Sequence, residues 1–188
     1  WLDYSIKSML EQTIFPSEFV LVEDGKLTDE LENVIKKYVD EYQNLFNIVK
    51  LEKNVGLGPA LRIGIENCKY EFIARMDSDD YSCKNRIEEQ FKIFEKDESL
   101  GLVGCNVEEF EGSIDNVNCH VILPETQEEI YKFSKKRCPF RHPSLLYRKS
   151  EVMKAGNYRE FYLCEDYDIY IRMLKSGCKC YNIQKPLV

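Results

Sequence analysis

Short apolar runs and helical patterns alternate along the first half of the chain. The run Phe19–Val22 is uniformly apolar and ends at Glu23–Gly25, which is typical of a buried strand that leads into a turn. Thr28 then begins a segment with apolar residues on one helical face, so a capped helix is predicted. Together, this strand and helix make one βα unit.

The same order recurs further along the chain, and it sets the expected fold class. Consecutive βα units build a parallel sheet with helices on its faces. The sequence therefore predicts an α/β fold with a mostly parallel central sheet flanked by helices. The further strands are expected at 46–51, 71–76, 102–105, 144–147 and 180–183, and the further helices at 59–67, 85–96, 126–134, 150–155 and 165–175.

A cluster of three carboxylates follows the predicted strand at 71–76. Asp77, Asp79 and Asp80 lie within four residues of one another. In an open α/β sheet, ligands bind beyond the carboxyl ends of the strands, so chemistry is expected here. Asp77 and Asp79 can offer hard oxygen ligands to one Mg²⁺ ion, which points to a metal-bound phosphorylated substrate. The alternative is a solvated acidic turn in which Asp80 or Ser82 caps the next helix.

The composition limits the class of protein. A chain of 188 residues is long enough for one sizeable domain with its own core. The formal net charge is -7 and the densest basic segment is only Lys135–Arg137, so a nucleic-acid partner is not expected. No apolar run reaches the ~18 to 20 residues of a membrane-spanning helix, and a cytoplasmic protein is expected. The eight cysteines lack the paired spacing of a zinc site and are expected to be reduced thiols.

Six short motifs follow one another along the chain in a recognisable order. They are Ser8–Thr13 in the first helix, Val22–Gly25, the glycine-rich Asn54–Leu61, the acidic Met76–Asp80, His142–Ser144 and Cys164–Arg172. Taken in this order, they resemble the family-two glycosyltransferases of the GT-A fold, in which Met76–Asp80 corresponds to the metal motif. An Asp-x-Asp motif alone occurs by chance in many chains, but the order and spacing of several motifs together are specific. The resemblance runs almost from end to end and is nearest to bacterial capsule and exopolysaccharide enzymes.

This resemblance implies a single glycosyltransferase domain over residues 1–188. Family members begin with a further strand, whereas this sequence opens inside the first helix. It also ends where the family continues, so we expect the domain to lack its first strand and its C-terminal end. Two smaller departures are Arg62, where asparagine is common, and Glu23, where aspartate is common.

The resemblance also implies an activity. We expect an inverting glycosyltransferase, a hexosyltransferase, that moves a sugar from a nucleotide-diphosphate donor to a saccharide or lipid-linked acceptor in surface polysaccharide synthesis. The expected donor is a UDP-sugar, and the expected cofactor is Mg²⁺ or Mn²⁺ held by Asp77 and Asp79. Such enzymes work at the cytoplasmic face of the membrane, so a peripheral membrane association is compatible with the sequence.

The other site residues follow from the same resemblance. Asp24 and Asp77 are expected to contact the nucleotide, with Asp24 accepting the imino N–H of uracil. Asp166 is expected to be the general base that takes the proton of the acceptor hydroxyl. Glu165 and His142 are candidates for contacts with the acceptor or the diphosphate.

Each of these residues also has a purely structural interpretation. Asp24 fits a turn residue beside Gly25. Glu165 and Asp166 fit the negative charge that stabilises a helix N-terminus. His142 fits a hydrogen-bonded structural histidine.

Three other functions share parts of the pattern. A calcium loop would use Asp77, Asp79 and Glu88, but Ser82 stands where that loop needs glycine. A sugar nucleotidyltransferase shares the fold and the use of metal, and it would release pyrophosphate. A non-catalytic nucleotide-sugar-binding subunit of an assembly would keep the binding site without turnover.

Overall fold

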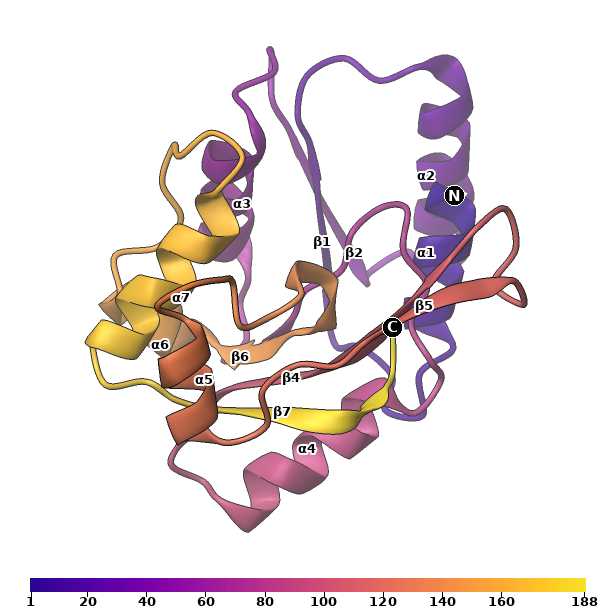
Figure 1. Ribbon diagram of the computed structural model, residues 1–188. Coiled ribbons are helices and arrows are strands. Elements are labelled where there is room, and N and C mark those ends of the chain that lie inside the picture. The colour runs from indigo at the N-terminus through magenta and orange to yellow at the C-terminus, as the bar shows by residue number, and fades with distance from the viewer.

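Helices surround two sets of strands in the computed structural model, which describes residues 1–188 (Figure 1). None of the helices combines the length and the apolar character needed to cross a membrane. In chain order the elements are α1 (Leu2–Leu10), β1 (Phe19–Glu23), α2 (Asp29–Glu41), β2 (Phe46–Lys50), α3 (Leu57–Asn67), β3 (Phe72–Ala74), α4 (Arg86–Lys96), β4 (Leu100–Phe110), β5 (Val117–Val121), α5 (Gln127–Phe133), the 3-10 turn η1 (His142–Ser144), β6 (Leu146–Arg148), α6 (Lys149–Lys154), α7 (Glu165–Lys175) and β7 (Lys179–Pro186).

The first βα units form as the sequence predicts. β1 and β2 pair in parallel, with Phe19 opposite Phe46 and their rings stacked 4.8 Å apart. The Thr28 hydroxyl caps α2 by accepting the Leu31 N–H. Tyr38 of α2 packs with apolar residues of α1 in a small core of its own. The capped helix and the parallel strand pair are therefore confirmed.

The larger sheet is mixed. Its strand order is β3-β6-β4-β5, and β7 also pairs with β4. β4 and β7 are parallel, whereas the pairs β3–β6, β6–β4 and β4–β5 are antiparallel. The α/β class with flanking helices is confirmed, but the expected predominance of parallel pairs does not hold in this sheet. The reason is that β6 follows the turn η1 and runs between β3 and β4 in the opposite direction, which the order of elements along the chain does not reveal.

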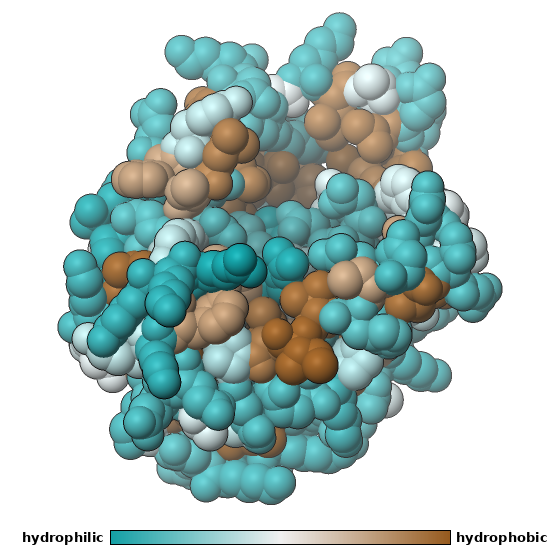
Figure 2. Space-filling model, in the orientation of Figure 1, coloured by the Kyte–Doolittle hydropathy of each residue, from teal (hydrophilic) through white to brown (hydrophobic).

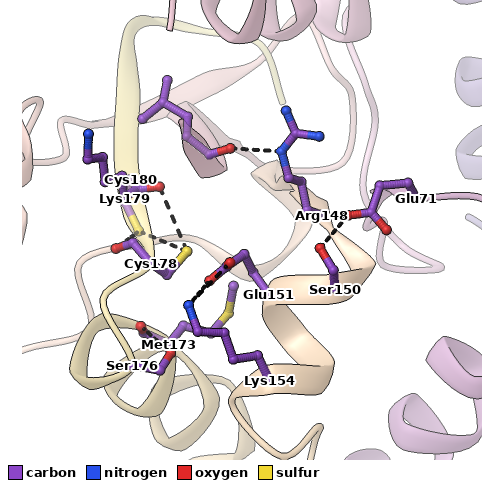
Figure 3. A network of polar contacts seen from close by, with 11 residues as sticks. Glu71, Arg148, Ser150, Glu151, Lys154, Met173, Ser176, Cys178, Lys179 and Cys180 are labelled. Atoms are coloured by element: carbon purple, nitrogen blue, oxygen red, sulfur yellow. Dashed lines mark hydrogen bonds and ion pairs between the residues drawn. The ribbon is translucent and has the colours of Figure 1, made fainter. Parts of the chain in front are cut away.

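The main core lies between the larger sheet and helices α5 to α7. Leu102 of β4, Tyr147 of β6 and Ile169 of α7 are almost completely buried in a cluster of 15 residues. Polar contacts close this layer at its rim, where Arg148 donates to the Leu100 carbonyl at 3.0 Å and Ser150 hydrogen-bonds Glu71 (Figure 3). This layer fixes the position of α7 and of the carboxylates at its start.

Several elements differ from the sequence prediction at their ends, and one strand was not predicted. α3 begins at Leu57, earlier than the expected start at Pro59, because Gly56 with φ 89° provides the turn into the helix. The strand β5 is absent from the ranges predicted above. His120 lies in β5 opposite Glu108 of β4, with its Nδ1 2.9 Å from that carboxylate. β5 is largely exposed, so its sequence lacks the apolar run of a buried strand.

Candidate functional site

The acidic loop Asp77–Asp80 lies just beyond the carboxyl end of β3, as predicted. Asp79 is exposed, and the Asp77 side chain keeps 32% of its surface open to solvent. Burial, together with the charges of Asp77 and Asp79, raises the pKa of Asp80 to about 6. The interpretation of Asp80 or Ser82 as a helix cap is wrong, because α4 has Asn85 at its N-cap position.

The polar face of α1 holds this loop through its main chain. The Ser5 hydroxyl donates to the Asp77 carbonyl at 2.6 Å, and the Ser8 hydroxyl accepts the Ser82 N–H at 3.1 Å. The buried Gln12 amide donates to the Cys83 carbonyl at 2.8 Å and accepts the N–H of Ile87 at 3.1 Å. These bonds give a physical reason for the residue types in the first-helix motif.

Two buried arginines lie beneath the acidic loop. Arg75 directly follows β3, is only 6% exposed and forms an ion pair with Asp77. Arg86 is fully buried and donates to the carbonyls of Pro143 at 2.5 Å and Arg75 at 3.2 Å. Burial lowers the pKa of Arg86 to about 10, so it remains charged at neutral pH. Both arginines were missed from the sequence, although a cation at the end of an apolar strand was a signal for Arg75.

The donor set of the loop fits a divalent cation. Asp77 and Asp79 are separated by one residue and are both open to solvent. After burial, the charges of Asp77 and Asp79 contribute to the raised pKa of Asp80, so the loop carries concentrated negative charge. The protein brings no cluster of three or more ligating side chains together. Mg²⁺ typically takes one or two carboxylates and completes its shell with water and substrate phosphates, so this set is of the right kind.

Asp24 directly follows β1 and binds the main chain of the glycine-rich segment. Its Oδ1 accepts the Val55 N–H at 2.7 Å, and its Oδ2 accepts the Gly56 N–H at 3.1 Å. These bonds give Asp24 a structural role between two distant segments, while its contact with uracil stays a prediction. The neighbouring Glu23 is buried and pairs with Lys50 at 2.9 Å, away from solvent.

The glycine-rich segment brings α3 against the residues that precede α7. A Cβ atom on Gly58 would lie 2.2 Å from the Arg159 carbonyl oxygen and 3.4 Å from Cβ of Glu165. Only glycine permits this approach. The motif Asn54–Leu61 thus helps to place the start of α7, which carries the candidate base.

Asp166 lies in the first turn of α7, where the sequence predicts it. Its Oδ1 accepts the Tyr167 N–H at 2.6 Å, and the Cys138 thiol lies 3.9 Å from its Oδ2. The buried face of α7, with Ile169 and Met173, anchors the helix in the main core. Asp166 is only partly buried, so its carboxylate is held and remains accessible.

Tyr158 lies in the segment before α7. It is buried, and its hydroxyl lies 3.0 Å from Nε2 of His142. Burial raises the pKa of Tyr158 to about 12, while the charge of Arg75 lowers it and the charge of Asp166 raises it. The hydrogen bond with His142 thus joins the segment before α7 to the turn η1.

His142 is a neutral, hydrogen-bonded histidine. Burial and, to a smaller extent, the charge of Arg75 hold its pKa well below the usual value. Its ring packs against Tyr158 and Tyr170. The structural interpretation of His142 is confirmed, and its contact with acceptor or diphosphate stays a prediction, as does that of Glu165.

Comparisons with known proteins find sequences similar to this chain. The family model "Glycosyl transferase family 2" matches residues 1–156. A β-1,3-galactosyltransferase from Escherichia coli that acts on GlcNAc-diphosphoundecaprenol is 36% identical over 100% of this chain and 67% of its own length. The amylovoran biosynthesis glycosyltransferase AmsE of Erwinia amylovora is 33% identical over 100% of this chain and 69% of its length.

Solved structures share the fold at low sequence identity. Residues 1–349 of Staphylococcus aureus TarS match with a TM-score of 0.78 and 18% identity, covering 100% of this chain and 55% of that one. The mannosyltransferase PcManGT of Pyrobaculum calidifontis matches with a TM-score of 0.71 and 15% identity, over 98% of this chain and 50% of that one. The chain thus spans about half the length of these structures and about two thirds of the curated relatives.

The close approach at Gly58 makes a stability prediction. Gly58→Ala should lower the free energy of unfolding by about 1 to 3 kcal/mol, because the new methyl group overlaps the Arg159 carbonyl. Gly64→Ala in the same helix is the control, since its Cβ would meet only a Val22 methyl group at 3.2 Å. Urea denaturation measures both variants, and equal stability of the two would contradict the packing argument.

Proposed function

The chain belongs to glycosyltransferase family 2, and from this premise we propose that it is an inverting hexosyltransferase that uses a UDP-sugar. The proposed acceptor is a saccharide or lipid-linked saccharide in the synthesis of a bacterial surface polysaccharide. The observation that carries the proposal is the acidic loop, in which Asp77 and Asp79 are open to solvent. Ser5 of α1 binds the main chain of this loop, Arg86 binds the Arg75 carbonyl just before it, and Arg75 pairs with the Asp77 carboxylate.

The donor site is proposed at this loop. Asp77 and Asp79 would hold Mg²⁺ or Mn²⁺, and the cation would neutralise the charge that builds on the leaving diphosphate. TarS has been solved with UDP-GlcNAc, and PcManGT with GDP-Man and Mn²⁺, which supports a nucleotide-sugar and metal at the corresponding fold position. The name of the E. coli relative specifies UDP-Gal and favours a uridine donor here. Asp24 is the proposed uracil contact.

The acceptor hydroxyl is proposed to lose its proton to Asp166. The helix main chain fixes one carboxylate oxygen through the Tyr167 N–H, and the other lies beside the Cys138 thiol. A single carboxylate within hydrogen-bond reach suffices as a general base. Since the same helix start is packed against α3 through Gly58, Asp166 keeps its position when donor and acceptor bind.

An apolar loop beside Asp166 supports an acceptor with a lipid part. Tyr162 and Leu163 directly precede α7 and are 88% and 76% exposed. Figure 2 shows a mostly hydrophilic surface with apolar side chains gathered on both sides of a hollow at the top of the face. The basic segment Lys135–Arg137 is exposed and lies close to the start of α7. On one side of this segment the Ser134 carbonyl accepts a hydrogen bond from the Tyr167 hydroxyl, and on the other side the Cys138 thiol lies beside Asp166.

This combination of charge and apolar surface suits a lipid diphosphate. The cations complement phosphate, and exposed aromatic and aliphatic side chains favour the boundary of a membrane. We therefore propose that the protein works in the cytoplasm as a peripheral protein at the membrane face. The E. coli relative, whose acceptor is a diphosphoundecaprenol saccharide, supports this choice.

The first prediction concerns the metal. UDP should bind far more weakly in chelator than in Mn²⁺, and Asp79→Ala should lower the Mn²⁺-dependent affinity by about tenfold or more, because one carboxylate ligand is lost. Isothermal calorimetry measures both effects. Asp115→Ala, an exposed acid in the β4–β5 hairpin, is the control. Equal UDP affinity with and without Mn²⁺ would contradict the donor site.

The second prediction separates catalysis from binding. Asp166→Asn keeps the size of the side chain, so the variant should fold and bind UDP normally while transferring sugar at least ~100-fold more slowly. Asp168→Asn is the matched control, since Asp168 pairs with Arg172 at 2.7 Å and serves the helix. The assay follows UDP release.

The same assay distinguishes the alternative functions. Near-normal transfer by a folded Asp166→Asn protein would rule out the base. Release of pyrophosphate would instead identify a nucleotidyltransferase. Donor binding with no turnover under any acceptor would identify a binding subunit of an assembly.

The third prediction tests the apolar loop. The double change Tyr162→Ser and Leu163→Ser should raise KM for a lipid-linked acceptor by about tenfold or more, because two apolar contacts with the lipid are lost. The kinetics with a water-soluble acceptor analogue should not change. Ile122→Ser, which alters an apolar side chain that is 76% exposed on another element, is the control. A parallel loss with both acceptors would show that the loop does not contact lipid.

A further inference from the structure

We propose that Arg75 is an internal counter-ion that makes metal binding at the acidic loop depend on the nucleotide diphosphate. In the free protein the guanidinium partly neutralises Asp77, so a divalent cation alone binds weakly. When the nucleotide donor is bound, the negative charge of its diphosphate restores the attraction between the loop and the divalent cation. This inference rests on the proposed function, because it takes the metal and the diphosphate as ligands of the loop.

The position of Arg75 is the first observation. Its side chain is 6% exposed and pairs with Asp77 from the buried side, while the other side of Asp77 is open to solvent. The Asp77 carboxylate thus faces the Arg75 guanidinium on its buried side and a candidate metal site on its solvent side. No other carboxylate pairs with Arg75, and its Nε has no hydrogen-bond partner within the protein.

Arg75 is held where it is from several sides. Its N–H donates to the Leu145 carbonyl at 2.9 Å, and its carbonyl accepts from Arg86 at 3.2 Å. The groups that face the guanidinium from η1 and α7 are neutral, because burial keeps His142 deprotonated and Tyr170 protonated. These neighbours supply no charge to replace Asp77. The Arg75 guanidinium therefore remains paired with Asp77 when a metal ion binds.

The local charges explain the dependence on nucleotide. Three carboxylates of the loop lie above two buried guanidinium groups, Arg75 and Arg86, which leaves about one negative charge for a free cation. A nucleoside diphosphate adds negative charge on the open side. Charges a few ångströms apart in a partly buried site interact strongly, so removing the Arg75 charge changes the affinity for a divalent ion by about tenfold or more.

The test measures Mn²⁺ binding without nucleotide, by the electron paramagnetic resonance signal of free Mn²⁺. Arg75→Gln removes the charge and keeps a hydrogen-bond donor for Asp77, and Arg75→Lys keeps the charge. Arg148→Gln is the matched control, because Arg148 is a half-buried arginine that contacts Phe72 and the Leu100 carbonyl and no carboxylate of the loop. Circular dichroism verifies that each variant is folded.

We expect the Mn²⁺ affinity to differ between variants that lose the charge of Arg75 and variants that keep it. Arg75→Gln should bind free Mn²⁺ about tenfold or more tightly than the unmodified protein, whereas Arg75→Lys and Arg148→Gln should stay within about threefold. UDP should then enhance Mn²⁺ binding less in Arg75→Gln than in the unmodified protein, because part of the coupling between UDP binding and Mn²⁺ binding is lost with the Arg75 charge. Unchanged or weaker binding of free Mn²⁺ by folded Arg75→Gln would overturn the proposal.

If Arg75→Gln does not fold, Arg75→Met, which replaces the buried charge by an apolar chain, takes its place with the same expected gain in Mn²⁺ affinity. Arg75→Lys, which keeps the charge, remains the comparison. If the unmodified protein binds no Mn²⁺ even with UDP, the proposed donor site itself fails. If it binds Mn²⁺ with UDP but the neutral variants show no gain, only the role of Arg75 fails.

Discussion

The geometry of the site depends on buried side chains that bind the main chain of the acidic loop. Ser5 and Ser8 of α1, with Gln12 just after this helix, reach this main chain from one side, and Arg86 reaches the carbonyls of Arg75 and Pro143. Leaving one such buried group without its partner costs about 1 to 3 kcal/mol, so these contacts favour one conformation of the loop. The loop can therefore present Asp77 and Asp79 to solvent in a fixed arrangement.

The two halves of the site are joined by close packing rather than by sequence proximity. Gly58 lets the start of α3 touch Arg159 and Glu165, which are far from it in the chain. The buried Tyr158 hydroxyl lies 3.0 Å from Nε2 of His142, and this contact joins the segment before α7 to η1.

Sequence reasoning predicted the parts of this structure that depend on local pattern. α7 begins at Glu165 as expected, and Asp77 and Asp79 follow β3 because an apolar run that ends in acids has few other structures available. It could not predict the direction of β6 or the contact of Gly58 with Arg159, since both are set by long-range packing. Arg75 and Arg86 were missed because a charged residue is ordinarily assigned to the surface. The sequence left two roles open for Asp24, a structural role and a contact with uracil. The structure shows hydrogen bonds that belong to the structural role.

The central claim is that the acidic loop binds a nucleoside diphosphate together with a divalent cation. The most direct measurement is an anomalous difference map from crystals grown with UDP and MnCl₂. The account predicts one Mn²⁺ peak in contact with Asp77 or Asp79 and with the diphosphate oxygens, with uracil beside Asp24. UDP bound elsewhere, or bound at the loop with no Mn²⁺ peak beside these carboxylates, would contradict it.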